Sequence, residues 1–153
     1  MMFIKEFVGS DISADFGLRI VSIDTGISTG ICVATFYKTY YEINYSCTIG
    51  KEYILNTLDM IFIRNFEEPI LVIMERLPEN KNSELVIIEQ IFINYLFKIQ
   101  ITPLEISPSE WKPISKARGW DCLSNKTIHE CDAFKMIRFF MLKNYTQDIG
   151  DWN

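Results

Sequence analysis

Three acidic residues stand where a predicted secondary-structure element begins or ends. Asp24 closes the apolar run LRIVSID (18–24), and Glu75 closes the apolar run ILVIME (70–75). Asp132 lies in the first turns of a predicted helix near the end of the sequence. Carboxylates that lie close together repel one another and cannot all stay ionised without a cation. Mg²⁺ and Mn²⁺ prefer oxygen ligands, so the three acids are candidate ligands of such ions.

His129 and Glu130, just before Asp132, differ in whether their spacing lets them share a metal ion with it. His129 precedes Asp132 by three residues, so both side chains project from one face of a helix, and His129 is a candidate fourth ligand. The sequence leaves open whether His129 is instead a surface residue at the helix start. Glu130 lies about 200° around the helix from Asp132 and is not expected to share a metal with it. Thr127 and Glu130 have the T-x-x-E spacing of a capping box, which predicts that the helix begins there.

Alternating strands and helices must bring these residues together. Apolar runs rich in β-branched and aromatic residues predict strands, and apolar residues at helical spacing predict helices. Pro69 ends the first helix, Pro108 favours a short helical turn, and the region 112–126 is interpreted as a loop. The predicted strands are 18–24, 29–37, 39–49, 70–75 and 101–107. The predicted helices are 51–66, 84–99 and the segment from the capping box to Asn144.

The order of these elements predicts an α/β fold. Three strands in a meander, followed by strands that alternate with helices, imply a five-stranded mixed sheet flanked by helices. If the first and fourth strands are parallel neighbours, Asp24 and Glu75 share the rim where functional sites gather. Residues 18–153 are predicted to form a single domain. Residues 1–17 form an N-terminal extension, interpreted as an extra strand, a helix or a flexible lead-in, and not as a signal peptide.

Composition and charge narrow the class of protein. Apolar residues make up 48% of the 153 residues, which excludes a disordered chain, and no apolar run reaches the roughly 18 residues that cross a bilayer. The net charge of −5 means that any surface for nucleic acid must be local, and the segment from Lys112 to Lys143, where basic residues outnumber acids, permits such a surface. The four cysteines show no CxxC spacing, so we expect free thiols, no zinc site and a cytoplasmic location.

Four short motifs resemble those of a known group. DTGISTG (24–30) is similar to a D-x-[GS]-x-x-T-G turn, and LVIMER (71–76) is similar to a second acidic strand. ISPSEWK (106–112) and HECDAF (129–134) are similar to the end of the fifth strand and the start of the last helix. Together they resemble the RuvC-like group of the RNase H-like superfamily, which contains Holliday-junction resolvases and their phage relatives. The resemblance covers residues 18–143.

This resemblance implies an RNase H-like fold and a nuclease activity. By resemblance, Asp24, Glu75, His129 and Asp132 would be the catalytic residues and would hold two Mg²⁺ or Mn²⁺ ions. The activity would be hydrolysis of DNA phosphodiesters at branched structures such as Holliday junctions, and the enzyme would be a homodimer without a membrane partner. The expected nucleic-acid contacts are Gly26, Thr29, Lys81, Lys112, Lys116 and Arg118.

The sequence also departs from the family pattern. Many members carry a Gly- and Lys-rich segment and another helix before the last helix, whereas only 16 residues separate Lys112 from His129 here. The main alternative is therefore an inactive RNase H-like domain that binds nucleic acid or a protein. A related nuclease acting on RNA is a nearby variant. An actin-like ATP-binding domain, whose first turn also carries D-x-G, needs two such halves and more residues than this chain has.

Each candidate residue also has a purely structural interpretation. Asp24 is typical of the start of a tight turn, and Asp132 suits a helix N-terminus because of the helix dipole. Gly30 is explained equally well as a turn residue. Trp111 and Trp120 could stack on bases, but packing in the core or at its rim is the simpler interpretation.

Overall fold

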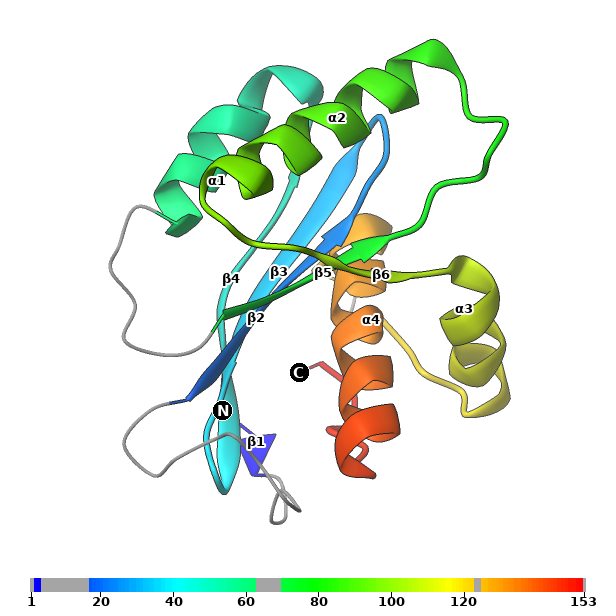
Figure 1. The fold of residues 1–153 in the computed structure, drawn as a ribbon. Helices are drawn as coiled ribbons and strands as arrows, with labels where there is room; N and C mark the ends of the chain where they lie inside the picture. Colours follow the sequence, from blue (N-terminus) through cyan, green and yellow to red (C-terminus); the bar gives the residue numbers. More distant parts are fainter. Residues whose placement is uncertain (1, 4–16, 63–69, 123–124, 153) are drawn as a thin grey trace.

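Residues 2–3, 17–62, 70–122 and 125–152 are described by the computed structural model, in which helices cover both faces of one mixed sheet (Figure 1). The strands are β1 (Met2–Phe3), β2 (Leu18–Asp24), β3 (Thr29–Phe36), β4 (Tyr40–Ile49), β5 (Ile70–Glu75) and β6 (Leu104–Ile106). The helices are the 3-10 turn η1 (Lys51–Tyr53), α1 (Ile54–Phe62), α2 (Ser83–Lys98), α3 (Pro108–Ala117) and α4 (Ile128–Tyr145).

The strand order confirms the predicted α/β architecture. β2, β3 and β4 form an antiparallel meander, while β5 is parallel to β2 and β6 is parallel to β5. β1 adds two residues to the sheet edge beside β4, so part of the N-terminal extension is a strand. Residue 1 and residues 4–16 of that predicted extension lie outside the described residues.

The parallel pairing of β2 with β5 decides where the acids lie. Ile23 is in register with Met74, so the residues that follow, Asp24 and Glu75, stand at the same rim of the sheet. Asp24 is also in register with Gly30 on the antiparallel neighbour β3. The predicted shared rim required the first and fourth predicted strands to be parallel neighbours, and β2 and β5 are.

Two hydrophobic layers hold the sheet between its helices. Residues of β2 and β3 alternate between the faces, as the period of two requires. Val21 and Ile31 pack with α1 and α2, whereas Ile20 and Ala34 pack with α4. All eight residues of β3 are buried, so the central strand is covered on both sides. None of the described helices is long and apolar enough to span a membrane.

The capping box predicted at the start of α4 is confirmed. The Thr127 hydroxyl accepts a hydrogen bond from the Glu130 amide at 3.1 Å, and the Thr127 amide donates to Glu130 Oε2 at 3.0 Å. The Ser46 hydroxyl on β4 donates to Glu130 Oε1 at 2.7 Å. These bonds fix the first turn of α4 against the sheet, which is why Glu130 has a structural role.

Helix α3 corrects the prediction of a loop over residues 112–126. The helix begins at Pro108, as its first-turn proline suggested, and continues through Pro113 to Ala117. A proline within a helix removes one backbone hydrogen bond, while the bond from the Ser107 amide to Glu110 Oε2 caps the start of this helix. The helix was missed because residues 112–126 show little hydrophobic periodicity.

Other boundaries differ by a few residues. β6 occupies three residues of the predicted strand 101–107 and lies at the edge of the sheet, where it pairs on one side. The predicted helix 51–66 is observed as η1 and α1, and residues 63–69, which include the predicted stop at Pro69, lie outside the described part of the chain.

Candidate functional site

Asp24 and Glu75 form the centre of the candidate site. Asp24 is 8% exposed at the end of β2, and Glu75 is partly buried at the end of β5. The two carboxyl groups are close enough for each to affect the ionisation of the other. Two acids 51 positions apart in the sequence are thus brought close together by the β2–β5 pairing.

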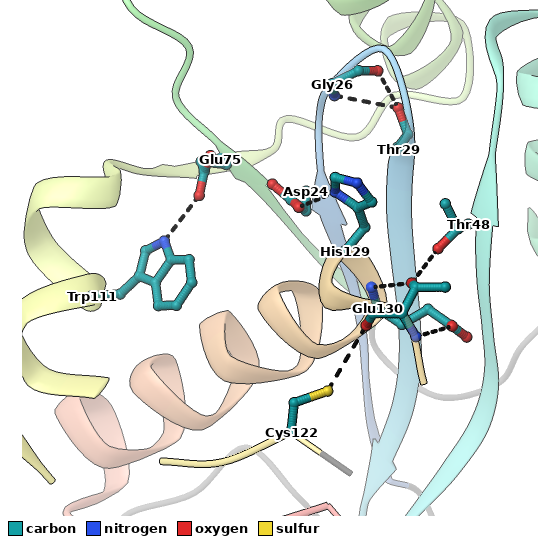
Figure 2. Close-up of polar contacts among 10 residues, drawn as sticks. Asp24, Gly26, Thr29, Thr48, Glu75, Trp111, Cys122, His129 and Glu130 are labelled. Atoms are coloured by element: carbon teal, nitrogen blue, oxygen red, sulfur yellow. Dashed lines mark hydrogen bonds and ion pairs between the residues drawn. The ribbon is translucent and has the colours of Figure 1, made fainter. Parts of the chain in front are cut away.

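Helix α4 places the other two predicted residues beside this pair. His129 Nδ1 lies 3.4 Å from Asp24 Oδ2, so the imidazole covers one side of the carboxyl group (Figure 2). Asp132, which is half-buried, lies almost one turn further along α4. Its negative charge acts on both Asp24 and Glu75. All four residues predicted as metal ligands therefore gather at one rim of the sheet.

The acids of this site are difficult to ionise together. Burial, followed by the negative charges of Glu75 and Asp132, raises the pKa of Asp24 to about 8. Burial also raises the pKa of Glu75 and of Asp132. The positive charge of Lys112, on α3, opposes the rise at all three acids without cancelling it. A bound cation would supply the missing positive charge, as the repulsion argument from the sequence anticipated.

Among the described residues, no group of three or more His, Cys, Asp or Glu side chains could hold a metal ion. The chemistry of the two neighbouring carboxylates still suits a hard divalent cation that keeps most of its water ligands. Mg²⁺ characteristically takes one or two carboxylates and completes its octahedron with water and phosphate oxygens. The Asp24–Glu75 pair, with Asp132 and His129 beside it, offers that kind of open, oxygen-rich site.

Gly30 allows α4 to approach the sheet closely enough to bring His129 to Asp24. A Cβ atom at position 30 would overlap the carbonyl group of His129 and lie 2.8 Å from the His129 Cβ. The sequence suggested only a turn residue at this position. At Gly30, the backbone of β3 lies so close to the first turn of α4 that no side chain fits between them.

The turn after Asp24 is closed by its own residues. The Thr29 hydroxyl donates to the Gly26 carbonyl at 2.8 Å, and Thr29 is 1% exposed (Figure 2). Thr29 thus has a structural role, and its predicted contact with nucleic acid stays a prediction, as does that of Gly26. Ile27 and Ser28, at the tip of the turn, are exposed.

The four predicted basic contacts fall into two groups. Lys112 and Lys116 are exposed one helical turn apart on α3, and Lys112 is close enough to affect the three acids. Lys81 forms an ion pair with Glu89 at 3.3 Å, and Arg118 lies 4.0 Å from Asp148. Exposed ion pairs contribute little to stability, so Arg118 can exchange its partner for a phosphate at small cost.

Trp111 is a residue of the site that the sequence did not reveal. Its side chain is 1% exposed, which confirms the predicted packing role, but its indole N–H also donates to Glu75 Oε2 at 3.1 Å (Figure 2). Trp111 and Glu75 are 36 positions apart, and no motif connects them. Only the packing of α3 against the end of β5 brings them together.

A disulfide bond between Cys122 and Cys131 corrects the expectation of four free thiols. The two Cα atoms are 5.5 Å apart, within the range that disulfides span. Cys32 and Cys47 are free. The prediction was wrong because it rested on the lack of a CxxC motif, whereas the segment before α4 folds back onto the first turn of that helix.

Replacing Cys122 by Ser should destabilise the oxidised protein by about 2–3 kcal/mol, because the bond closes a short loop of the unfolded chain. Thermal unfolding without reductant measures this effect, and Cys47→Ser is the matched control. With excess dithiothreitol, the wild type and Cys122→Ser should unfold at nearly the same temperature. Equal stability of the two proteins without reductant would contradict the bond.

The raised pKa of Asp24 predicts how stability depends on pH when no metal is present. Between about pH 4 and pH 8 the folded chain keeps a proton that the unfolded chain releases, since an unfolded Asp has a pKa of about 3.9. The free energy of unfolding should therefore fall as the pH rises through this window. At pH 8, Mn²⁺ at about 100 times its dissociation constant should restore about 2.7 kcal/mol. Thermal melts with EDTA or Mn²⁺ measure both effects, and Asp24→Asn should weaken both.

No protein-family model matches this chain, and no curated protein matches it significantly. A functional assignment must therefore depend on the geometry of the site and on the sequence motifs.

Proposed function

We propose that this protein is a divalent-metal-dependent endonuclease that hydrolyses DNA phosphodiester bonds at branched structures such as Holliday junctions. The observation that carries the proposal is the closeness of Asp24 and Glu75 at the ends of parallel neighbouring strands, with Asp132 and His129 beside them. Four motifs that resemble the RuvC-like group of RNase H-like nucleases support the same assignment.

In this proposal, four residues together would hold two ions of Mg²⁺ or Mn²⁺. These residues are Asp24, Glu75, Asp132 and His129. When bound, the ions would activate a water molecule and stabilise the leaving oxygen of the phosphodiester. Asp24 lies 3.4 Å from His129 Nδ1 and is close enough to Glu75 for each acid to affect the ionisation of the other. His129 fixes the orientation of the Asp24 carboxyl group, which lets the acid meet its ion without reorganisation.

Exposed cations on α3 support binding of a nucleic-acid backbone. Lys112 is close enough to affect the ionisation of the three acids, so a phosphate beside those acids would also lie near its ammonium group. Lys116 continues the same exposed face one turn further on. Because contacts between lysines and phosphates release counterions, binding through this local cationic surface should weaken as the salt concentration rises.

Cleavage of a panel of labelled DNAs tests the proposal. The panel holds a four-way junction, a flap, a duplex and a single strand of matched sequence, with Mg²⁺, Mn²⁺ or EDTA. We expect metal-dependent cleavage that favours the branched substrates. The alternative is an inactive RNase H-like domain that binds nucleic acid or a protein, which the acidic net charge favours. Binding without cleavage of any substrate would favour that alternative.

The outer surface of α2 supports the proposal of a homodimer. Val86 and Phe97 are 44% and 80% exposed, and their separation of eleven residues places them on one face of the helix, three turns apart. Ile87, 50% exposed, widens this apolar face. A second copy that packs on the same helix by a two-fold axis would bury both ends of this apolar face at once.

Phe97→Asp should therefore shift the protein toward the monomer, with at least about a tenfold weaker dimer, because an unpaired charge would enter the contact. Light scattering coupled to size exclusion, over a range of concentrations, measures the change. Lys38→Asp, in the exposed turn between β3 and β4, is the control. A wild type that is monomeric at all concentrations would rule out this dimer.

A further inference from the structure

We propose that Trp111 is a positioning residue that biases the site toward Mg²⁺ and Mn²⁺ and against Ca²⁺, by holding Glu75 through one carboxylate oxygen. This inference rests on the proposed function, because it assumes that Glu75 is a metal ligand. It follows from the hydrogen bond of the Trp111 indole N–H to Glu75 Oε2, at 3.1 Å.

The hydrogen bond leaves the two oxygens of Glu75 unequal. A carboxylate can bind a cation through one oxygen or through both. Ca²⁺ takes six to eight oxygens and often binds carboxylates through both of theirs, whereas Mg²⁺ is octahedral and is satisfied by one or two carboxylates with water. An N–H group on Oε2 competes with a cation for that oxygen. Glu75 is thereby biased toward binding through Oε1 alone, which favours the smaller ion.

The packing of Trp111 makes this bond difficult to displace. The indole is 1% exposed and belongs to the core between the sheet and α4. Its helix is fixed at its start by the bond from the Ser107 amide to Glu110 Oε2, at 2.8 Å. Just before that start, the Arg76 amide, next to Glu75, donates to the Ile106 carbonyl at 2.8 Å. The N–H group therefore stays in place, and the Glu75 carboxylate adapts to it.

Trp120 provides a matched comparison within the same core. It is 5% exposed, and its indole nitrogen is buried with no hydrogen-bond partner among the described residues. Its ring packs against the guanidinium of Arg138 at 4.3 Å, and no hydrogen bond joins its indole nitrogen to the acids. Trp111→Phe and Trp120→Phe thus remove the same atoms from the same core, but only the first removes a bond to Glu75.

Metal binding by the full chain tests the inference without a nuclease assay. Bound Mn²⁺ is measured by electron paramagnetic resonance and is then displaced by Ca²⁺ or Mg²⁺. We expect Trp111→Phe to raise the affinity for Ca²⁺ relative to Mg²⁺ at least about fivefold, because Glu75 can then use both oxygens. Trp120→Phe should leave the ratio unchanged. Benzothienylalanine at position 111, which keeps the ring shape and lacks the N–H, should reproduce the effect of Trp111→Phe if that variant folds poorly.

The outcomes separate this inference from the proposed function. If the wild type binds no Mn²⁺, both the metal site and the inference are wrong. If the wild type binds Mn²⁺ but Trp111→Phe and the benzothienyl variant keep its Ca²⁺ to Mg²⁺ ratio, the metal site stands and the role of Trp111 is wrong. A uniform loss of affinity for both ions would also overturn the inference, since it would indicate a general structural role.

Discussion

Asp24→Asn should reduce the rate of cleavage by about 10³-fold or more, equivalent to about 4 kcal/mol of transition-state stabilisation. Asp24 lies beside both Glu75 and His129, so its loss removes the centre of the site. The neutral amide also avoids the burial of a charge, and the repulsion from Glu75 and Asp132, that raise the pKa of Asp24. The metal-free variant should therefore be at least as stable as the wild type at pH 8. Single-turnover cleavage and thermal unfolding of the same samples measure the two effects.

Asp121→Asn is the control for this prediction. Asp121 is an exposed acid in the segment between α3 and α4, and in the described part of the chain no hydrogen bond or ion pair joins it to the four site residues. Its replacement should leave cleavage within about twofold of the wild type, as expected for a surface site. If Asp24→Asn cleaves DNA as fast as Asp121→Asn does, Asp24 has no role in the reaction. If it is inactive only because it is unfolded, the melting curve will show that directly.

Gly30→Ala should both destabilise the protein and impair the site. The new Cβ atom would overlap the His129 carbonyl group, and overpacking of this kind costs about 1–3 kcal/mol. Since backbone atoms of β3 and α4 meet here, relief requires α4 to move away from the sheet and to carry His129 from Asp24. We expect lower stability and a loss of cleavage of at least about tenfold, as small displacements of reacting groups are costly.

Gly50→Ala is the matched control for the steric argument. A Cβ atom at position 50 would meet the carboxylate of Glu52, which is the flexible end of an exposed side chain and can move aside. This variant should retain cleavage and nearly full stability. An active Gly30→Ala protein with wild-type stability would show that the contact between β3 and α4 does not determine the position of His129.

The strands and the acids were the most predictable part of this protein. β2 and β5 begin and end where the apolar runs indicated, because a short apolar segment that ends at a charged residue is typical of a buried strand. The capping box located the start of α4 for a similarly local reason: Thr127 and Glu130 bond to each other's backbone. Once strand order was inferred, the meeting of Asp24 with Glu75 followed.

The contacts that shape the site depend on packing between distant elements and could not be anticipated. Trp111 reaches Glu75 only because α3 packs beside β5, and the weak periodicity of residues 112–126 gave no sign of that helix. The absence of a side chain at Gly30 has meaning only when α4 lies against β3. The bond between Cys122 and Cys131 depends on the path of a segment without periodicity.

The C-terminal segment illustrates the same limit. Arg138 is 7% exposed on α4 and forms ion pairs with Asp148, at 2.5 Å, and with Asp151, at 2.7 Å. These bonds hold the end of the described chain against α4 beside Trp120. The sequence showed a charged residue in an otherwise apolar helix face, but it did not indicate which acids would neutralise it.

The most direct test of the central claim is cleavage of a 5′-labelled four-way junction by the wild type as Mg²⁺ or Mn²⁺ is titrated, with Asp24→Asn in parallel. The account predicts cleavage by the wild type that rises with the ion, stops with EDTA and is lost in the variant, while a duplex of the same sequence is cut far more slowly. Cleavage that persists in EDTA or in Asp24→Asn would contradict it. So would a folded wild type that binds the junction and cuts no DNA at any concentration of either ion.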